Sequence, residues 1–424
     1  MIEITGNYNK AKVYTNKCDD VCRTQIKELL DQEPFRDAKV RIMPDCHAGK
    51  SCVIGFTADL GDKIIPNIVG VDIGCGMLTI SLGKGDIDYG RLDMVIRKFV
   101  PSGREVNSSR LVHYTDLQEM ICYRELADTR KIERAIGSLG GGNHFIEVDM
   151  DTEGNHYLVI HTGSRQLGTQ VCNIYQKIAV GLHTGKEELW NKEEHIKKEY
   201  KEAGKRADIN EAIMELHRNF HQIPSDLPYD LCYLYGRYCQ DYLHDMKVCQ
   251  EYADVNRHMI ASQIIENYGF SVTDEFSTVH NYIDHESNIV RKGAVSAREG
   301  ERLVIPINMR DGALLCIGKG NEDWNYSAPH GAGRRYSRTE AFNKFSVEEY
   351  EETMRNAGIY TTCVNHSTLD ECPFAYKGME DIVENITPTA EIVKIIKPVY
   401  NFKANSTTIK KTPKQIEKTD DSVD

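Results

Sequence analysis

The sequence predicts an α+β protein, a single large mixed α/β domain with central β-sheets and a peripheral helical region. Short apolar runs bounded by turn residues, at 157–160, 303–307 and 313–317, are typical of buried strands. Residues 241–268 place apolar or small side chains at helical spacing and predict a long helix that packs on the core. Residues 184–220 are so strongly charged that they indicate exposed helices laced with ion pairs.

The same patterns predict the other elements. In chain order they are a strand at 11–14, a helix at 19–31, a strand at 39–43, a helix at 167–180, a helix at 346–357 and an apolar segment at 391–400. In the first helix we expect Val21, Ile26, Leu29 and Leu30 on the buried side. The passage 43–56 reads as rich in turns, and 66–80 as buried strand-like surface that includes Val71.

Composition bounds the class of protein. With 40% hydrophobic and 27% charged residues, the 424-residue chain has the profile of a soluble globular protein. No stretch approaches the roughly 20 apolar residues that span a bilayer, and the N-terminus lacks a signal-peptide pattern, so we expect a cytoplasmic protein that does not bind membranes. The net charge of −12 argues against a protein that coats nucleic acid along a basic track. A nucleic-acid substrate would be held at a few phosphates.

The cysteines and histidines divide into a structural majority and a few candidates. Thirteen cysteines at irregular spacing, without a CxxC pair, indicate small core residues such as Cys122, Cys172 and Cys316 rather than disulfides. His156, His195 and His217 are expected in solvent. From residue 405 the composition turns to Thr, Lys, Gln and Asp, which predicts a domain at 1–404 and a disordered tail at 405–424.

Asp72 and Cys75 lie among glycines in the apolar run PNIVGVDIGCGMLTI. Burying a carboxylate in such a run costs free energy unless the carboxylate is paired or bound to a cation. If a metal ion is bound there, the thiol three residues later is a natural second ligand. A turn-capping aspartate beside an inert buried cysteine is the alternative. His144, His161 and His280 also occur near glycines or at strand ends. This mixed O, S and N set suits Mn²⁺ or Zn²⁺, and a bridging thiolate would allow two ions, a common arrangement for reactions at phosphorus.

The stretch SAPHGAGRRYSR, residues 327–338, contains His330 in a loop rich in Gly and small residues. Such a loop lets backbone N–H groups approach a phosphate, and Arg334, Arg335 and Arg338 add positive charge. We interpret His330 as a nucleophile for phosphorus. A solvated glycine turn that holds one histidine is the alternative from the local residues alone.

The chain resembles the RtcB-type RNA ligases. The motifs MPDCHAG, GVDIGCG, GGGNHFIE, HTGSRQLG, HNY, VRKGA, HGAGR and AYK occur in the family's order, over nearly the whole chain to about Lys403. The resemblance implies an RtcB-type catalytic domain and a ligase, dependent on GTP and two Mn²⁺ ions, for RNA repair or tRNA splicing. Its substrates would be an RNA 3′-phosphate, or a 2′,3′-cyclic phosphate opened first, and a 5′-hydroxyl.

The resemblance also implies roles for particular residues. His330 would attack the α-phosphorus of GTP and pass the guanylate to the RNA 3′-phosphate, and the 5′-hydroxyl would then displace it. Cys75 would bridge two ions, one held by Asp72 and His144 and the other by His161 and His280. The nucleotide and RNA contacts would be Asn143, Phe145, Glu147, Asn281, Asn308, Arg334, Tyr376 and Lys403 for GTP, and Arg165 and Arg338 for RNA phosphates.

The sequence departs from the family in three places. Val295-Ser296 follow VRKGA, PINM at 306–309 places Asn308 where a serine is common, and the tail beyond Lys403 is long. These changes put the RNA-end preference in question more than guanylylation. The alternatives are a paralogue that guanylylates RNA ends without sealing them, a dinuclear metal phosphohydrolase in which His330 orients phosphate, and a non-enzymatic metal- or RNA-binding module. The sequence leaves open the need for an activating protein partner.

Overall fold

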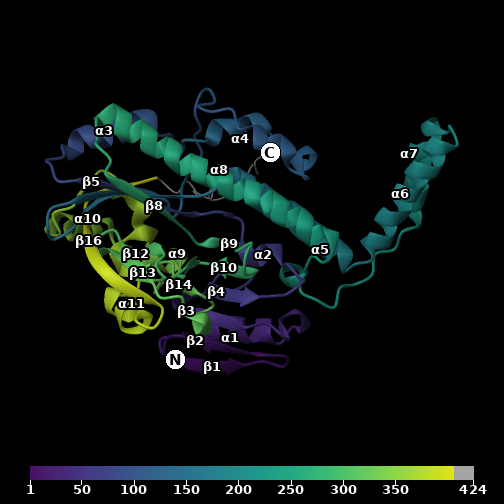
Figure 1. Cartoon of the computed structure of the whole chain (residues 1–424), viewed down its shortest axis with the longest axis horizontal. Coiled ribbons are helices and arrows are strands. Elements are labelled where there is room, and N and C mark those ends of the chain that lie inside the picture. The colour runs from purple at the N-terminus through teal and green to yellow at the C-terminus, as the bar shows by residue number, and fades with distance from the viewer. Residues whose placement is uncertain (405–424) are drawn as a thin grey trace, which may run out of the picture.

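Two large β-sheets and one long helix frame the molecule, seen in a computed structural model that describes residues 1–404 (Figure 1). The mixture of helices and strands confirms the predicted α+β class. The predicted tail lies outside the described residues. The larger sheet has the order β12-β13-β16-β6-β7-β5-β8, with β15 paired to β16, and the second sheet has the order β1-β2-β3-β4-β10-β9.

The larger sheet is predominantly antiparallel and curls until its edge strands meet. Its strands are β5 (Gly76–Gly83), β6 (Phe145–Met150), β7 (His156–Thr162), β8 (Asp274–Val279), β12 (Arg302–Asn308), β13 (Gly312–Gly318), β15 (Tyr360–Thr361) and β16 (Ala390–Lys403). The backbone N–H of Val304 on β12 donates to Thr278 Oγ1 on β8 at 3.3 Å, which links the two edges. Met77, Phe145, Val159 and other apolar side chains pack together inside the curl. The sheet is therefore a nearly closed barrel with an apolar interior.

The helix α8 (Arg237–Tyr268) crosses the outer face of this sheet (Figure 1). It includes all of the predicted 241–268 and begins four residues earlier, after Gly236. Ile260 and Ile264 on α8 pack against apolar residues of β5, β6 and β7, together with Leu92 and Ile96 of α3 (Tyr89–Phe99). This packing gives the strands that carry the site a rigid backing.

The second sheet holds the N-terminal part of the chain. Its strands are β1 (Ile2–Thr5), β2 (Lys10–Val13), β3 (Val40–His47), β4 (Ile54–Asp59), β9 (Asn281–Ile283) and β10 (Ile289–Lys292). The passage 43–56, predicted to be rich in turns, is mostly strand, because β3 runs on to His47 and β4 starts at Ile54. The helix α1 (Asp20–Leu30) packs on this sheet, but the prediction for Val21 was wrong: it is exposed, and Cys22 takes the inward position.

Two further expectations need correction. Residues 66–69 form the short helix α2 (Pro66–Val69) instead of a strand, because Pro66 is well suited to the first turn of a helix and Gly70, with φ of 95°, ends it. Val71 is partly exposed rather than buried. His156, expected in solvent, is the first residue of β7 and is buried, and burial lowers its pKa.

The remaining helices surround this frame. They are α4 (Thr129–Ala135), α5 (Arg165–Leu182), α6 (Lys186–Glu202), α7 (Ile209–Asn219), α9 (Arg338–Lys344), α10 (Val347–Asn356) and α11 (Met379–Ile386). Helices α6 and α7 project away from the body (Figure 1), and His195 and His217 on them are exposed as predicted. A short two-stranded sheet, β11 (Ala294–Ser296) with β14 (Ser327–Pro329), leads into the loop of His330.

All thirteen cysteines lie within the described residues, are free, and are buried except Cys239. This confirms the expectation of thiols in the core without disulfides. Within residues 1–404, no helix has the length and apolarity that crossing a bilayer requires.

Candidate active site

Five side chains expected to bind metal meet at one end of the larger sheet. Asp72 and Cys75 lie in the loop before β5, His144 precedes β6, His161 is on β7, and His280 follows β8. Cys75 Sγ lies 3.3 Å from His161 Nε2 and 3.6 Å from His144 Nε2, and His144 Nε2 lies 3.0 Å from Asp72 Oδ2. The donors form two groups, Asp72-Cys75-His144 and Cys75-His161-His280, each with its ligand atoms within 4.8 Å of one another. Cys75 belongs to both groups.

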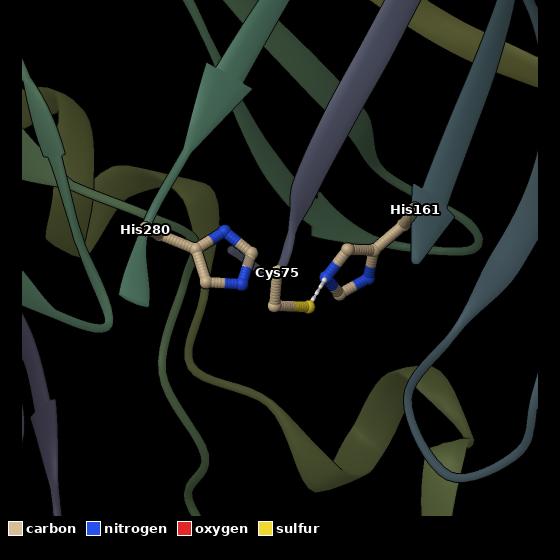
Figure 2. Close-up of side chains that lie close together, drawn as sticks. All are labelled: Cys75, His161 and His280. Carbon is tan, nitrogen blue, oxygen red and sulfur yellow. Dashed lines mark hydrogen bonds between the residues drawn. The ribbon is translucent and has the colours of Figure 1, made fainter. Parts of the chain in front are cut away.

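Backbone acceptors fix two of these imidazole rings. His144 Nδ1 lies 2.9 Å from the carbonyl oxygen of Leu139, and His161 Nδ1 lies 3.2 Å from that of Asn143. Donation from Nδ1 leaves Nε2 of His161 unprotonated and turned toward the thiol, whereas Nε2 of His144 also lies within hydrogen-bond distance of Asp72 Oδ2. Figure 2 shows the rings of His161 and His280 on either side of the thiol. The Nδ1 of His280 is buried without a hydrogen-bond partner in the described part of the chain. Such a donor set fits divalent metal ions of borderline softness.

Buried neighbours hold the loops that carry these ligands. The guanidinium of Arg257 on α8 is buried and donates to the carbonyl oxygens of Gly74, at 2.9 Å, and Thr162, at 3.0 Å, each next to a ligand. Gly163 faces Asp72 so closely that a Cβ there would lie 2.2 Å from Oδ1. Only glycine leaves room for the carboxylate at this position.

Burial sets the protonation of the donor cluster. It raises the pKa of the Cys75 thiol well above its usual range and lowers the pKa of His161 and His280 well below theirs. Burial also acts to raise the pKa of Asp72, but the hydrogen bond with His144 and its charge outweigh this effect and lower it. The imidazoles of His161 and His280 are therefore neutral and ready to coordinate, and a bound cation would favour the thiolate of Cys75.

His330, the predicted nucleophile, follows β14 and is oriented by a buried carboxylate. Its Nδ1 lies 2.6 Å from Oδ2 of Asp45, which also accepts the backbone N–H of His330 at 3.1 Å. Donation of Nδ1–H to this carboxylate leaves Nε2 with its lone pair free. The ring centroid lies 5.0 Å from that of His280, so the imidazole borders the donor cluster. Asp45 had no predicted role, although its place in the motif MPDCHAG was a signal that could have identified it.

A cavity of about 770 Å³ opens beside His330 and is large enough for a nucleotide. The predicted site residues among its lining are Asn143, Phe145, Glu147, His161, His280, Asn308, His330, Arg334, Arg338, Tyr376 and Lys403. These residues come from distant parts of the sequence, and the fold brings them together around one space.

Glu371, which was not among the predicted site residues, links the cationic side chains of this cavity. It is the last residue of the short 3₁₀ helix His366–Glu371 and is buried. Its carboxylate lies 2.9 Å from Lys403 Nζ, accepts from Arg338 at 2.7 Å and Arg334 at 3.2 Å, and accepts the hydroxyl of Tyr376 at 2.6 Å. Burial acts to raise its pKa, but Lys403 and the two arginines outweigh this effect and lower it to about 2.

Two residues predicted to contact phosphate already have protein partners. Arg334 also donates to the carbonyl oxygens of Tyr336, at 3.0 Å, and Asp370, at 2.6 Å. Arg338 pairs with the carboxylate of Asp370 as well as with Glu371. These contacts hold both guanidinium groups in the cavity wall and offset part of their charge.

Two of the three predicted asparagine contacts, Asn281 and Asn308, also hold parts of the protein itself. The side-chain oxygen of Asn308 accepts from the N–H groups of Arg310 and Asp311 at 3.0 Å, and its amide donates to the Asp311 carboxylate at 2.8 Å. Asn281 is not part of the lining of the large cavity. Its side chain donates to the carbonyl oxygen of Asp72 at 3.3 Å and accepts from Gly293 N–H at 3.0 Å, which braces the ligand loop.

Arg165 lies in a second cavity, of about 320 Å³, on the other side of the donor cluster. Asp72, His144, Arg104 and Lys131 also line it, whereas His161 and His280 line the large cavity. Arg165 donates to the carbonyl oxygen of Gly103 at 2.9 Å and to the hydroxyl of Ser138 at 3.2 Å. The ligand atoms thus separate two spaces, and the smaller one is lined by basic side chains.

A mixed donor cluster between two cavities, next to a histidine held by a buried aspartate, has the features of an enzyme active site. The model of the tRNA-splicing ligase RtcB family matches residues 28–125 and 121–404. The chain therefore belongs to this family, which is a family of RNA ligases.

Individual relatives agree with this assignment. RNA-splicing ligase RtcB of Escherichia coli strain K12 is 28% identical over 413 residues, which cover 87% of this chain and 91% of that protein. tRNA-splicing ligase RtcB of Aeropyrum pernix is 27% identical over 437 residues, which cover 81% and 83%. RNA-splicing ligase RtcB homolog 2 of Entamoeba dispar is 24% identical over 495 residues, which cover 94% and 89%.

Proposed function

We propose that this chain is a GTP- and Mn²⁺-dependent ligase that joins an RNA 3′-phosphate, or a 2′,3′-cyclic phosphate after opening, to a 5′-hydroxyl. The observation that carries the proposal is the position of His330. Its Nδ1 lies 2.6 Å from a buried carboxylate oxygen, it borders the donor cluster, and it lines a cavity of nucleotide size. Membership of the RNA ligase family supplies the RNA substrate.

In the first step, Nε2 of His330 attacks the α-phosphorus of GTP. A phosphorus–nitrogen bond forms, the bond between the α-phosphorus and the bridging oxygen breaks, and pyrophosphate leaves with that electron pair. Asp45 accepts the Nδ1–H throughout and stabilises the positive charge that develops on the ring. In the second step an RNA 3′-phosphate oxygen attacks the guanylate phosphorus, and the bond from that phosphorus to Nε2 of His330 breaks. In the third step the 5′-hydroxyl loses its proton to solvent and attacks the phosphorus of the 3′-phosphate, and GMP leaves with the electron pair of the broken P–O bond.

Metal ions would be held by Asp72, Cys75 and His144 on one side and by Cys75, His161 and His280 on the other. When bound, they would neutralise phosphate oxygens and lower the barrier to attack at phosphorus. The neutral imidazoles and the buried orphan nitrogen of His280 support this use of the cluster.

The large cavity would take GTP with its base at the Glu147 end. A carboxylate repels phosphates but accepts hydrogen bonds from the N1–H and N2–H of guanine, so we assign Glu147 to the base rather than to the phosphates. Phe145 and Tyr376 supply ring surfaces, and Lys403 lies with its ammonium 5.5 Å from the Phe145 ring centroid. The basic second cavity, with Arg165, would take the RNA 3′-phosphate.

The test is covalent labelling with GTP radiolabelled at the α-phosphate, in the presence of Mn²⁺. We expect the wild type to retain an acid-labile label, His330→Ala to lose it, and the control His195→Ala, on the exposed helix α6, to keep it. No label on the wild type would overturn the proposal and favour a phosphohydrolase. RNA with a 3′-phosphate and a 5′-hydroxyl then separates the outcomes, because a ligase gives a longer product and a capping paralogue gives only the guanylylated end.

A further inference from the structure

A second carboxyl group lies beneath Glu147 in the barrel interior. Glu147 and Asp149 are two residues apart on β6, so both side chains point to the same face of the strand, the face that Phe145 also uses. Both residues are buried, Asp149 completely. Glu147 reaches the large cavity, whereas Asp149 is not part of its lining.

Asp149 lacks a hydrogen-bond donor. Neither of its carboxyl oxygens accepts a hydrogen bond from an N–H or O–H group of the described residues. Tyr157, which is opposite Asp149 on β7, donates its hydroxyl to Asp151 instead, at 3.0 Å, and Lys394 donates to Asp151 at 2.7 Å. On the cavity side, Lys403 pairs with Glu371 at 2.9 Å. An ionised carboxylate buried without a donor is strongly disfavoured, so this carboxyl group keeps its proton.

A protonated Asp149 becomes a donor, and Glu147 is the acceptor beside it. Burial raises the pKa of Asp149 well above its usual range, with the charge of Glu147 adding to the effect. Burial also raises the pKa of Glu147, to about 7, although the Asn401 amide, which donates to its Oε2 at 2.9 Å, the charge of Lys403 and the bond from Asp149 all oppose the increase. Of the two carboxyl groups, Asp149 is the one whose surroundings favour the protonated form more strongly, because Glu147 has the Asn401 amide and Lys403 beside it.

We propose that Asp149 is a positioning residue for base selection: as a neutral acid it donates a hydrogen bond to Glu147 and keeps that carboxylate anionic and oriented toward guanine. Guanine presents two adjacent donors, N1–H and N2–H, to one carboxylate. Adenine presents an acceptor at N1, and hypoxanthine lacks the N2 amino group. The inference rests on the proposed function, because it assumes that the large cavity binds GTP.

The test measures binding of GTP and ITP to a protein that cannot form the covalent adduct. In a His330→Ala background with fixed Mn²⁺, calorimetry gives the ratio of the two affinities. Metal and triphosphate contacts are common to both nucleotides, so they cancel in this ratio. Asp149→Val removes the donor, and we expect it to lower the preference for GTP over ITP about tenfold, the effect of losing one charge-assisted hydrogen bond. Asp149→Asn keeps an amide donor and is expected to preserve the preference.

The pH dependence provides a second readout. GTP binding should strengthen as pH rises through the pKa of Glu147, and Asp149→Val should move this rise to higher pH because the donor that favours the anion is gone. Infrared spectra at pH 8 should contain the carbonyl band of a protonated carboxylic acid, which Asp149→Asn removes. This readout needs only the isosteric variant and holds even if Asp149→Val fails to fold.

The outcomes separate the two proposals. Equal loss of GTP and ITP affinity in Asp149→Val, or the absence of the protonated-acid band, would overturn this inference and leave the proposed function standing. Failure of GTP to bind the protein with Asp149 intact would overturn both.

Discussion

Replacing Asp45 by asparagine should slow guanylylation of His330 while leaving GTP binding nearly unchanged. Oδ2 of Asp45 accepts both the Nδ1–H and the backbone N–H of His330, at 2.6 and 3.1 Å, and the residue is fully buried. A hydrogen bond to a charged group contributes about 1.5–3 kcal/mol, against about 0.5–1.5 kcal/mol for a neutral one. The difference, about 1–2 kcal/mol, corresponds to a rate about 5- to 30-fold lower.

The asparagine carries a further cost that acts in the same direction. Oδ1 of Asp45 is buried without a partner in residues 1–404, so an amide nitrogen at that position would be an unsatisfied donor. If the amide rotates to avoid this, its N–H₂ group faces Nδ1 and favours the wrong tautomer of His330. The estimate of 5- to 30-fold is therefore a lower bound.

Single-turnover formation of the labelled adduct at saturating GTP measures the effect, and calorimetry measures the affinity for GTP. Asp59→Asn, at the exposed end of β4, is the matched control and should behave like the wild type. A change of less than twofold in the rate, with an unchanged melting temperature, would refute the role of Asp45. A loss confined to GTP affinity would refute it equally, because an orienting carboxylate acts on attack rather than on binding.

Three other changes test other parts of the site. Cys75→Ala should reduce bound Mn²⁺ from two ions per chain to at most one, measured by elemental analysis after dialysis; two retained ions would exclude a bridging role. Gly163→Ala should weaken Mn²⁺ binding at least tenfold because its Cβ would lie 2.2 Å from Asp72 Oδ1, whereas Gly85→Ala, where a Cβ meets open space, should not. Glu371→Gln should lower the free energy of unfolding by about 3–5 kcal/mol at pH 7 in urea titrations, since it removes the charge that the buried Lys403 and the partly buried Arg334 share with Arg338. Because folding lowers the pKa of Glu371 from 4.5 to about 2, its stabilisation is present above about pH 4.5 and is lost as pH falls toward 2; a parallel acid profile for the variant would contradict this.

Periodicity and turn chemistry were enough to predict much of the framework. The strands near 157–160, 303–307 and 313–317 and the long helix at 241–268 carry regular apolar patterns and were confirmed. The same patterns did not predict the structure of residues 66–69. A four-residue run that is mostly apolar fits a short helix as well as a strand, and the neighbouring residues determine which of the two forms. The burial of His156 depends likewise on the pairing of β7 with β5 and β6.

The residues of the candidate site that lie in glycine-rich motifs could be predicted from the sequence. The residues that contribute only through contacts with distant parts of the chain could not. His330 and the five metal-type donors come from glycine-rich stretches, and the fold brings them together. The surroundings of the arginines were not predictable. Arg334 and Arg338 were predicted to supply positive charge to phosphates, yet both also pair with Asp370 or Glu371, more than 30 residues away in the sequence. Long-range pairing of this kind leaves no periodic signal in a single sequence.

The partition of the site by its ligand atoms has a kinetic consequence. His161 and His280 face the large cavity and Asp72 and His144 face the small one, with Cys75 between them. If the nucleotide binds in the large cavity and the RNA end binds in the small one, an excess of either ligand does not prevent the other from binding. High GTP should then leave the apparent affinity for the RNA 3′-phosphate unchanged, and the reaction would need no fixed order of arrival. The thiol at the boundary would be the point where the two ligands meet.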